Sequence, residues 1–226
     1  MNPWWKRAIV ALVAGALLSG CAVGTSQAPP PSGQARRAPG STARVDPAQA
    51  ERLKQVMVPL IRVMNDPVPL NEVRVGIMDD EHVNAANAGR GEFYVTTGLL
   101  RRASDDQLRG VLAHEIAHAD LGHVAKLQTL GAGLNIGVFL LEQIIPGSSA
   151  ITPLAGRLIA NAYTRREEYA ADAHGATLLQ RGGEDGRTLM VDTLTWLEQA
   201  EGASGGGFFA THPATGDRIQ ALREAR

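Results

Sequence analysis

Residues 111–118 read VLAHEIAH, and the other predicted elements can be placed relative to this short stretch. It contains the pattern H-E-x-x-H inside a predicted helix. Because residues four apart lie on one face of a helix, His114 and His118 can present two imidazole nitrogens to a single metal ion. Zinc suits this pair, since imidazole is a common zinc ligand and zinc has little geometric preference of its own.

Glu115 follows the first histidine and lies about 100° around the helix from it. It is not needed as a ligand, and its carboxylate is placed to act as a general base toward an attacking water molecule. The alternative is a solvent-facing helix. Apolar neighbours such as Val111 and Ile116 instead indicate a buried helix, in which unpartnered histidines and a glutamate would be costly. This favours the metal site.

A second predicted helix, over residues 153–180, supplies a further ligand. A catalytic zinc held by two histidines needs a third protein ligand and an open position. In the sequence EYAAD at 168–172, Glu168 and Asp172 are four residues apart and share a face. Such pairs are common on surfaces, but the adjacent alanines allow two helices to approach closely. We predict Glu168 as the third ligand and Asp172 as the hydrogen-bond acceptor for the far nitrogen of a ligand histidine.

Composition excludes one class of partner. The chain has 226 residues and a formal net charge of −1, so no excess of basic charge indicates nucleic-acid binding. Its length allows one domain with a sizeable core.

The first 20 residues are predicted to be a lipoprotein signal peptide. Lys6 and Arg7 precede an apolar run over 8–18 that is short for a membrane span. Leu18-Ser19-Gly20-Cys21 resembles the lipobox of bacterial lipoproteins, which implies cleavage before Cys21 and acylation (palmitate included) of this residue. Cys21 is the only cysteine in the sequence. An uncleaved anchor or an ordinary secretory signal is the alternative.

Residues 21–46 are predicted to tether the domain to the membrane. Their content of Pro, Gly, Ser and Ala is too high to bury enough apolar surface for folding. Ala22 follows the cysteine instead of aspartate, and by resemblance to the usual sorting pattern this favours the outer membrane, facing the periplasm.

Residues 47–226 are predicted to form one mainly helical α+β domain. We expect a sheet of about three strands packed on the helix that carries His114, with a glycine turn at 89–91. Asp46 is the predicted N-cap of the first helix, and Pro59 should kink it. Ser104 and Gln107 predict a capping box. The expected helices cover residues 47–65, 97–102, 105–130, 153–180, 187–201 and a last segment opened by 211–213, and the expected strands cover 73–78, 84–88 and 92–96.

Two segments leave alternatives open. Residues 130–150 begin with a mostly apolar run containing three glycines; we favour a buried hairpin over a mobile flap or an edge that leans on a membrane. His123 lies about 140° around from His118 if the helix continues to residue 130. It would then point away from the metal face and be structural. His82, in an acidic turn, is expected to be a surface histidine.

Four motifs in order resemble peptidase family M48, the gluzincin zinc peptidases, over residues 47–226. They are FYVTTGLL at 93–100, HEIAH at 114–118, EYAAD at 168–172, and the pairs His212-Pro213 and Arg218-Ile219. The resemblance implies a zincin-like fold with one zinc ion at His114, His118 and Glu168, and Glu115 as the catalytic base.

The resemblance implies further site residues. His212 and Arg218 would lie by the active site, His212 as a hydrogen-bond donor in the transition state or as a removable fourth ligand. The strand with Phe93, Tyr94 and Val95 would be an edge strand that pairs with an extended substrate.

These observations predict a zinc endopeptidase that is lipid-anchored in the bacterial cell envelope and acts on unfolded or misassembled envelope proteins. One alternative is a latched, chaperone-like zinc-binding lipoprotein with little turnover. Another is a zinc hydrolase of cell-wall peptides. Glu115 argues against a purely structural zinc site, which would need no base.

Overall fold

The computed structural model describes residues 46–89, 91–123, 127–129, 136–140, 157–159, 163–201, 207–213 and 216–225. The predicted signal peptide, Cys21 and the tether up to residue 45 lie outside the described residues. The described part is mainly helical with a small mixed sheet, as the sequence predicted, and none of its helices is long and apolar enough to span a membrane.

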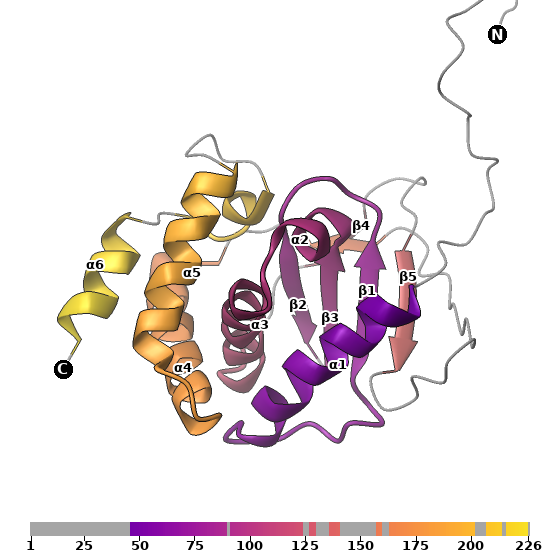
Figure 1. The fold of residues 1–226 in the computed structure, drawn as a ribbon, viewed down its shortest axis with the longest axis horizontal. Coiled ribbons are helices and arrows are strands. Elements are labelled where there is room, and N and C mark those ends of the chain that lie inside the picture. The colour runs from indigo at the N-terminus through magenta and orange to yellow at the C-terminus, as the bar shows by residue number, and fades with distance from the viewer. Residues whose placement is uncertain are drawn as a thin grey trace, which may run out of the picture. The chain divides into compact units, whose positions relative to one another are not determined.

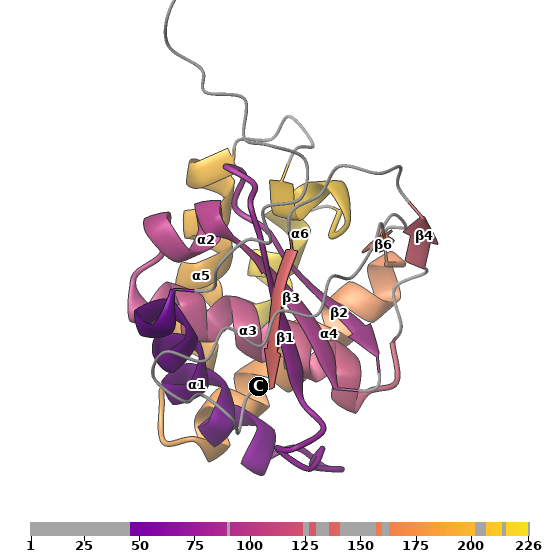
Figure 2. The same cartoon turned by 90° about the vertical axis from the view of Figure 1, so that its right-hand side faces the viewer.

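The sheet has four strands in the order β2-β3-β1-β5. β1 (Arg74–Met78) is parallel to β3 (Glu92–Thr96) and antiparallel to β5 (Ile136–Leu140). β2 (Ala85–Gly89) is antiparallel to β3. Figure 2 views the molecule from the side on which β5 pairs with β1. The prediction of about three strands therefore missed β5, which comes from the apolar segment 130–150.

Two further short strands, β4 (Leu127–Thr129) and β6 (Arg157–Ile159), pair with each other. Apart from β5, residues 130–150 lie outside the described residues, so the hairpin, flap and membrane-edge alternatives stay predictions.

One prediction about the sheet is wrong. The strand with Phe93, Tyr94 and Val95 was expected at the edge, but β3 is hydrogen-bonded to β1 on one side and to β2 on the other. Among the described residues, the edge strand on this side is β2. Strand spacing in the sequence shows which segments are strands, but their order depends on pairing between distant segments.

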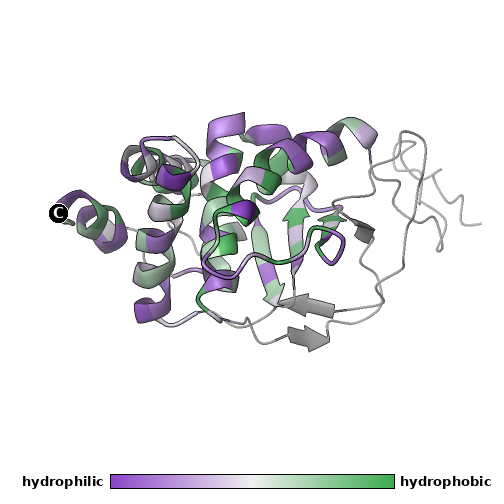
Figure 3. Ribbon diagram, turned by 90° about the horizontal axis from the view of Figure 1, so that it is seen from below, coloured by the Kyte–Doolittle hydropathy of each residue, from purple (hydrophilic) through white to green (hydrophobic). Residues whose placement is uncertain are grey.

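The helix α3 (Asp105–Asp120) lies between the sheet and the pair α4 (Arg165–Arg181) and α5 (Gly186–Glu201) (Figure 1). The buried apolar core includes Phe93, Leu112, Ile116, Leu178 and Leu194. In Figure 3 the ribbon is coloured by hydropathy, and hydrophobic residues (green) are found on the strands and on the helices. Three more helices complete the fold: α1 (Pro47–Arg62), α2 (Thr97–Arg102) and α6 (Gly216–Glu224), with a 3-10 turn at Gly207–Ala210.

The predicted caps of α1 and α3 are confirmed. Asp46 accepts a hydrogen bond from Ala48 N at 2.9 Å, and α1 runs through Pro59. Ser104 and Gln107 form the capping box of α3.

Two helix boundaries differ from the predictions. α3 ends at Asp120 rather than near residue 130, because Gly122 adopts a φ of +70° and His123 N donates back to His118 O at 2.8 Å. This is a Schellman motif, a common helix end at glycine. α4 begins at Arg165 rather than residue 153, because Thr164 and Glu167 form a capping box.

Candidate active site

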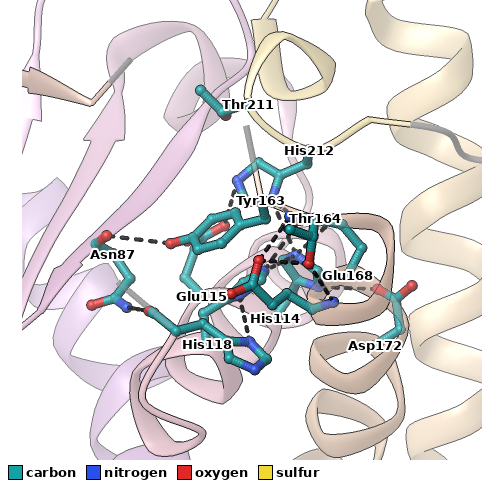
Figure 4. A network of polar contacts seen from close by, with 12 residues as sticks. Asn87, His114, Glu115, His118, Tyr163, Thr164, Glu168, Asp172, Thr211 and His212 are labelled. Carbon is teal, nitrogen blue, oxygen red and sulfur yellow. Dashed lines mark hydrogen bonds and ion pairs between the residues drawn. The ribbon is translucent and has the colours of Figure 1, made fainter. Parts of the chain in front are cut away.

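The predicted metal ligands converge on one buried position (Figure 4). α3 contributes His114 and His118, α4 contributes Glu168, and the turn that follows the 3-10 helix contributes His212. All four side chains are buried, and one ligand atom from each lies within 4.8 Å of the other three.

The spacing of these atoms fits a metal ion. His114 Nε2 lies 3.0 Å from His118 Nε2 and 3.3 Å from His212 Nδ1. Glu168 Oε1 lies 3.4 Å from His118 Nε2 and 3.0 Å from His212 Nδ1. A tetrahedral zinc with bonds of about 2.0–2.1 Å separates its ligand atoms by about 3.3 Å. The residues present therefore match the span of a zinc ion.

The charges of the site also fit a divalent cation. Three buried carboxylates, those of Glu115, Glu168 and Asp172, accompany one buried guanidinium, that of Arg218. Burying unbalanced charge is expensive. With neutral histidines, a divalent cation balances the two negative charges that Arg218 leaves uncompensated.

The protonation states of His118 and Glu168 favour ligation. Burial lowers the pKa of His118 to about 2, which keeps its imidazole neutral. Burial alone would raise the pKa of Glu168, but the neighbouring histidines, His212 first among them, outweigh this and lower it. Neutral imidazole and ionised carboxylate are the forms that bind metal. Burial would lower the pKa of His114, but Asp172 and Glu168 outweigh this and raise it, so a metal ion has to displace a proton there.

Asp172 and Arg218 contact two of the predicted ligands, His114 and Glu168. Asp172 Oδ1 lies 3.0 Å from His114 Nδ1, the contact that the sequence predicted. Arg218 donates to both oxygens of Asp172, at 2.7 and 2.6 Å, and its Nη1 lies 2.5 Å from Glu168 Oε2. The guanidinium thus ties helix α6 to one predicted ligand and to the partner of another.

His212 is buried rather than exposed. Its ring stacks on Phe208 with centroids 4.1 Å apart, and its Nε2 lies 3.2 Å from Glu115 Oε1. Apart from this contact, neither oxygen of Glu115 has a hydrogen-bond partner within the described part of the chain. A buried carboxylate with so few partners is suited to accept a proton.

The profile of Peptidase family M48 matches residues 47–226. The chain belongs to this family. Protease HtpX from Xanthomonas campestris pv. campestris (strain B100) is 29% identical over 236 residues, which cover 84% of this chain and 78% of that protein. Metalloprotease LoiP from Escherichia coli (strain K12) is 27% identical over 200 residues, which cover 85% of this chain and 78% of that protein.

Membership of family M48 makes the chain a zinc metallopeptidase, and the predicted enzyme class and cofactor are thereby confirmed. The roles assigned to Glu115, His212 and Arg218 stay predictions, although the structure brings all three residues to the cluster.

The position of His123 corrects the sequence analysis of this M48 peptidase. His123 was expected to point away from the metal face, but its Nδ1 lies 3.1 Å from Nδ1 of His118. The expectation assumed a helix that continues past residue 120, and the turn at Gly122 folds His123 back instead. Gly122 was the sequence signal for this turn.

Three more residues of the M48 site were missed from the sequence. The Tyr163 ring stacks on His118 with centroids 3.7 Å apart, and its hydroxyl donates to Asn87 O at 3.4 Å. The Phe208 ring stacks on the His212 ring. These residues precede or follow the recognised motifs, and no local pattern marks them.

Proposed function

We propose that the chain is an endopeptidase of the bacterial cell envelope that cleaves unfolded or misassembled envelope proteins. The observation that carries the peptidase chemistry is Glu115, a buried and nearly unpartnered carboxylate beside a cluster of four residues able to hold a metal ion.

Zinc, when bound by His114, His118 and Glu168, supplies a Lewis acid that polarises the scissile carbonyl and lowers the pKa of water. Glu115 accepts the proton of the attacking water and passes it to the leaving amine. His212 donates a hydrogen bond to the oxyanion that forms.

The substrate binds in an extended form along β2. Asn84 O accepts from Thr96 N of β3 at 3.0 Å, and backbone groups alternate in direction along a strand. The backbone groups of Ala85 and the N–H of Asn87 therefore face away from β3, while Asn87 O on the same side accepts from the Tyr163 hydroxyl at 3.4 Å. Recognition through backbone groups requires an unfolded, extended segment and depends little on its sequence. This supports misfolded proteins as substrates.

Cell-envelope location is proposed from the N-terminal sequence. Cleavage before Cys21 and acylation of this cysteine would anchor the domain to the outer membrane, with the domain in the periplasm.

The test is cleavage of casein, an unfolded protein, by the full-length chain. Glu115→Gln should lower kcat by at least about 100-fold, the usual contribution of a general base, and should still bind zinc. Chelation should stop the wild type, and added zinc should restore it. Glu167→Gln is a matched control, because glutamine can keep the capping box at the start of α4. A wild type that binds zinc and cleaves no faster than Glu115→Gln would refute the proposal.

A second candidate is a latched protein with little turnover. It is supported by the position of His212 Nδ1, which lies as close to the other ligands as they lie to one another. A fourth protein ligand would occupy the position that water needs. His212→Ala separates the two candidates, because activity should rise if His212 is a latch and fall if it stabilises the transition state.

A further inference from the structure

We propose that His123 is the positioning residue that fixes the tautomer and orientation of His118 at the zinc site. The proposal rests on the zinc site of the proposed function but does not require turnover. It assigns a partner to Nδ1 of His118, the ring nitrogen that does not face the other ligands, and the sequence motifs do not identify this partner.

The direction of the hydrogen bond between His118 and His123 follows from the role of His118 as a metal ligand. Its Nε2 faces His114 Nε2 and Glu168 Oε1, so this nitrogen needs a free lone pair to bind metal. A neutral imidazole then carries its proton on Nδ1. Nδ1 lies 3.1 Å from Nδ1 of His123, so His118 donates and His123 accepts.

The backbone holds His123 in position from two sides. Gly122, at a φ of +70°, turns the chain so that His123 N donates to His118 O at 2.8 Å. The carbonyl of His123 accepts from Asn87 Nδ2 at 3.0 Å. Asn87 is a buried residue of β2, so the substrate-side strand is connected to the zinc ligand through His123.

Tyr163 completes the arrangement around His118. Its ring covers one face of the imidazole, while its hydroxyl donates to Asn87 O. His118 is therefore held on its face by Tyr163 and at its edge by His123, and both partners are attached to the same residue of β2.

The two histidine ligands consequently have different partners. Asp172 accepts from His114 and supplies a negative charge, which makes an imidazole a stronger donor to metal. His123 can orient His118 without adding a charge to a site that already contains three buried carboxylates. We expect His123 to fix the orientation and the tautomer of the His118 ring.

The test is zinc affinity of the full-length chain, measured by competition with a chelator. His123→Leu removes the acceptor and should weaken zinc binding by about 10–100-fold, the usual effect of losing an outer partner. His123→Asn places an amide oxygen near the position of Nδ1 and should recover most of the affinity. His82→Leu is the control, since this side chain is 65% exposed.

Two readouts separate positioning from a general structural role. The unfolding midpoint of the metal-free His123→Asn protein should match that of the wild type, and the imidazole ¹⁵N shifts of zinc-loaded wild type should show His118 protonated at Nδ1. Equal zinc affinity in His123→Leu and wild type would overturn the proposal, as would zinc bound through His118 Nδ1. If His123→Leu does not fold, the ¹⁵N spectrum of the wild type still decides. Tight zinc binding without proteolysis would refute the peptidase proposal alone.

Discussion

At the scale of single residues, Arg218 is the buried cation that faces two buried carboxylates of the site. Its guanidinium is fully buried and contacts Glu168 and Asp172. Replacing it with methionine keeps the length of the side chain but leaves two buried carboxylates without their cation. Removing one partner of a buried ion pair typically costs about 3–5 kcal/mol.

We therefore expect Arg218→Met to lower the free energy of unfolding by about that amount in urea denaturation of the metal-free protein. Arg223→Met, on the exposed face of the same helix α6, is the matched control and should change stability little. If both variants unfold at the same urea concentration as wild type, the charge balance argued for the site is wrong.

The ionisation of Asp172 should make the stability of the folded protein depend on pH. Burial would raise the pKa of Asp172, but hydrogen bonds from Arg218 and His114 outweigh it and lower the pKa below 3.8. The folded protein therefore binds this proton less readily than the unfolded chain. The stabilisation is fully present above about pH 4 and disappears as the pH falls through the lowered pKa.

Asp172→Asn should accordingly be less stable than wild type at pH 7, with a difference that shrinks as the pH falls below about 4. Urea denaturation of the metal-free proteins at several pH values measures this difference. A gap that stays constant down to pH 2 would show that the carboxylate charge of Asp172 contributes nothing.

At the scale of helices and strands, the end of α3 depends on one glycine. A Cβ atom at Gly122 would meet no atom of the described residues within 4 Å, so the expected cost of a side chain comes from the φ of +70°. That conformation costs an L-residue roughly 1–2 kcal/mol.

Gly122→Ala should lower the free energy of unfolding by about that amount. Gly216→Ala is the control, because its Cβ is equally unobstructed and its φ is not in the left-handed region. It should be neutral or slightly stabilising, since alanine restricts the unfolded chain. Equal unfolding midpoints for the two variants would contradict this account.

Local patterns explain which elements were predictable. The caps at Asp46 and Ser104 are short-range signals, and the ligand spacing within α3 follows from helix geometry alone. The start of α4 was also readable, because Thr164 and Glu167 form a T-x-x-E pair, but the predicted helix began at residue 153.

Features set by distant contacts were not predictable in this way. The order β2-β3-β1-β5 depends on which strands pair, so β2, not β3, proved to be the edge strand. The contact between His123 and His118 required knowing that α3 stops at Asp120. Tyr163 and Phe208 reach the site only through the packing of segments far apart in the chain.

At the scale of the whole molecule, the site joins parts of the chain that are distant in sequence. His114 and His212 are 98 residues apart, and their ring nitrogens are 3.3 Å apart. The match to family M48 covers residues 47–226 and includes all of these residues. We expect the place of this domain in the cell to depend on the residues that precede it.

We predict that Cys21 anchors the chain through its lipid. A single acyl chain binds membranes weakly and reversibly, whereas two or more hold a protein stably. Cys21→Ala should abolish incorporation of a labelled palmitate analogue and move the protein from the membrane fraction to the soluble fraction, unless an uncleaved residue 8–18 segment retains it. The mass of the mature protein separates these outcomes, because only the retained form keeps its first 20 residues.

Ala22→Asp tests the sorting step separately from the anchor. This change leaves Cys21 in place, so labelling by the palmitate analogue should match wild type. If aspartate after the lipidated cysteine directs retention, the variant should shift from outer-membrane to inner-membrane fractions on a density gradient, with its casein cleavage unchanged because the catalytic domain is untouched. A wild type found in inner-membrane fractions, or one that never takes up label, would contradict the proposed outer-membrane location while leaving the zinc chemistry of residues 114–118 as argued.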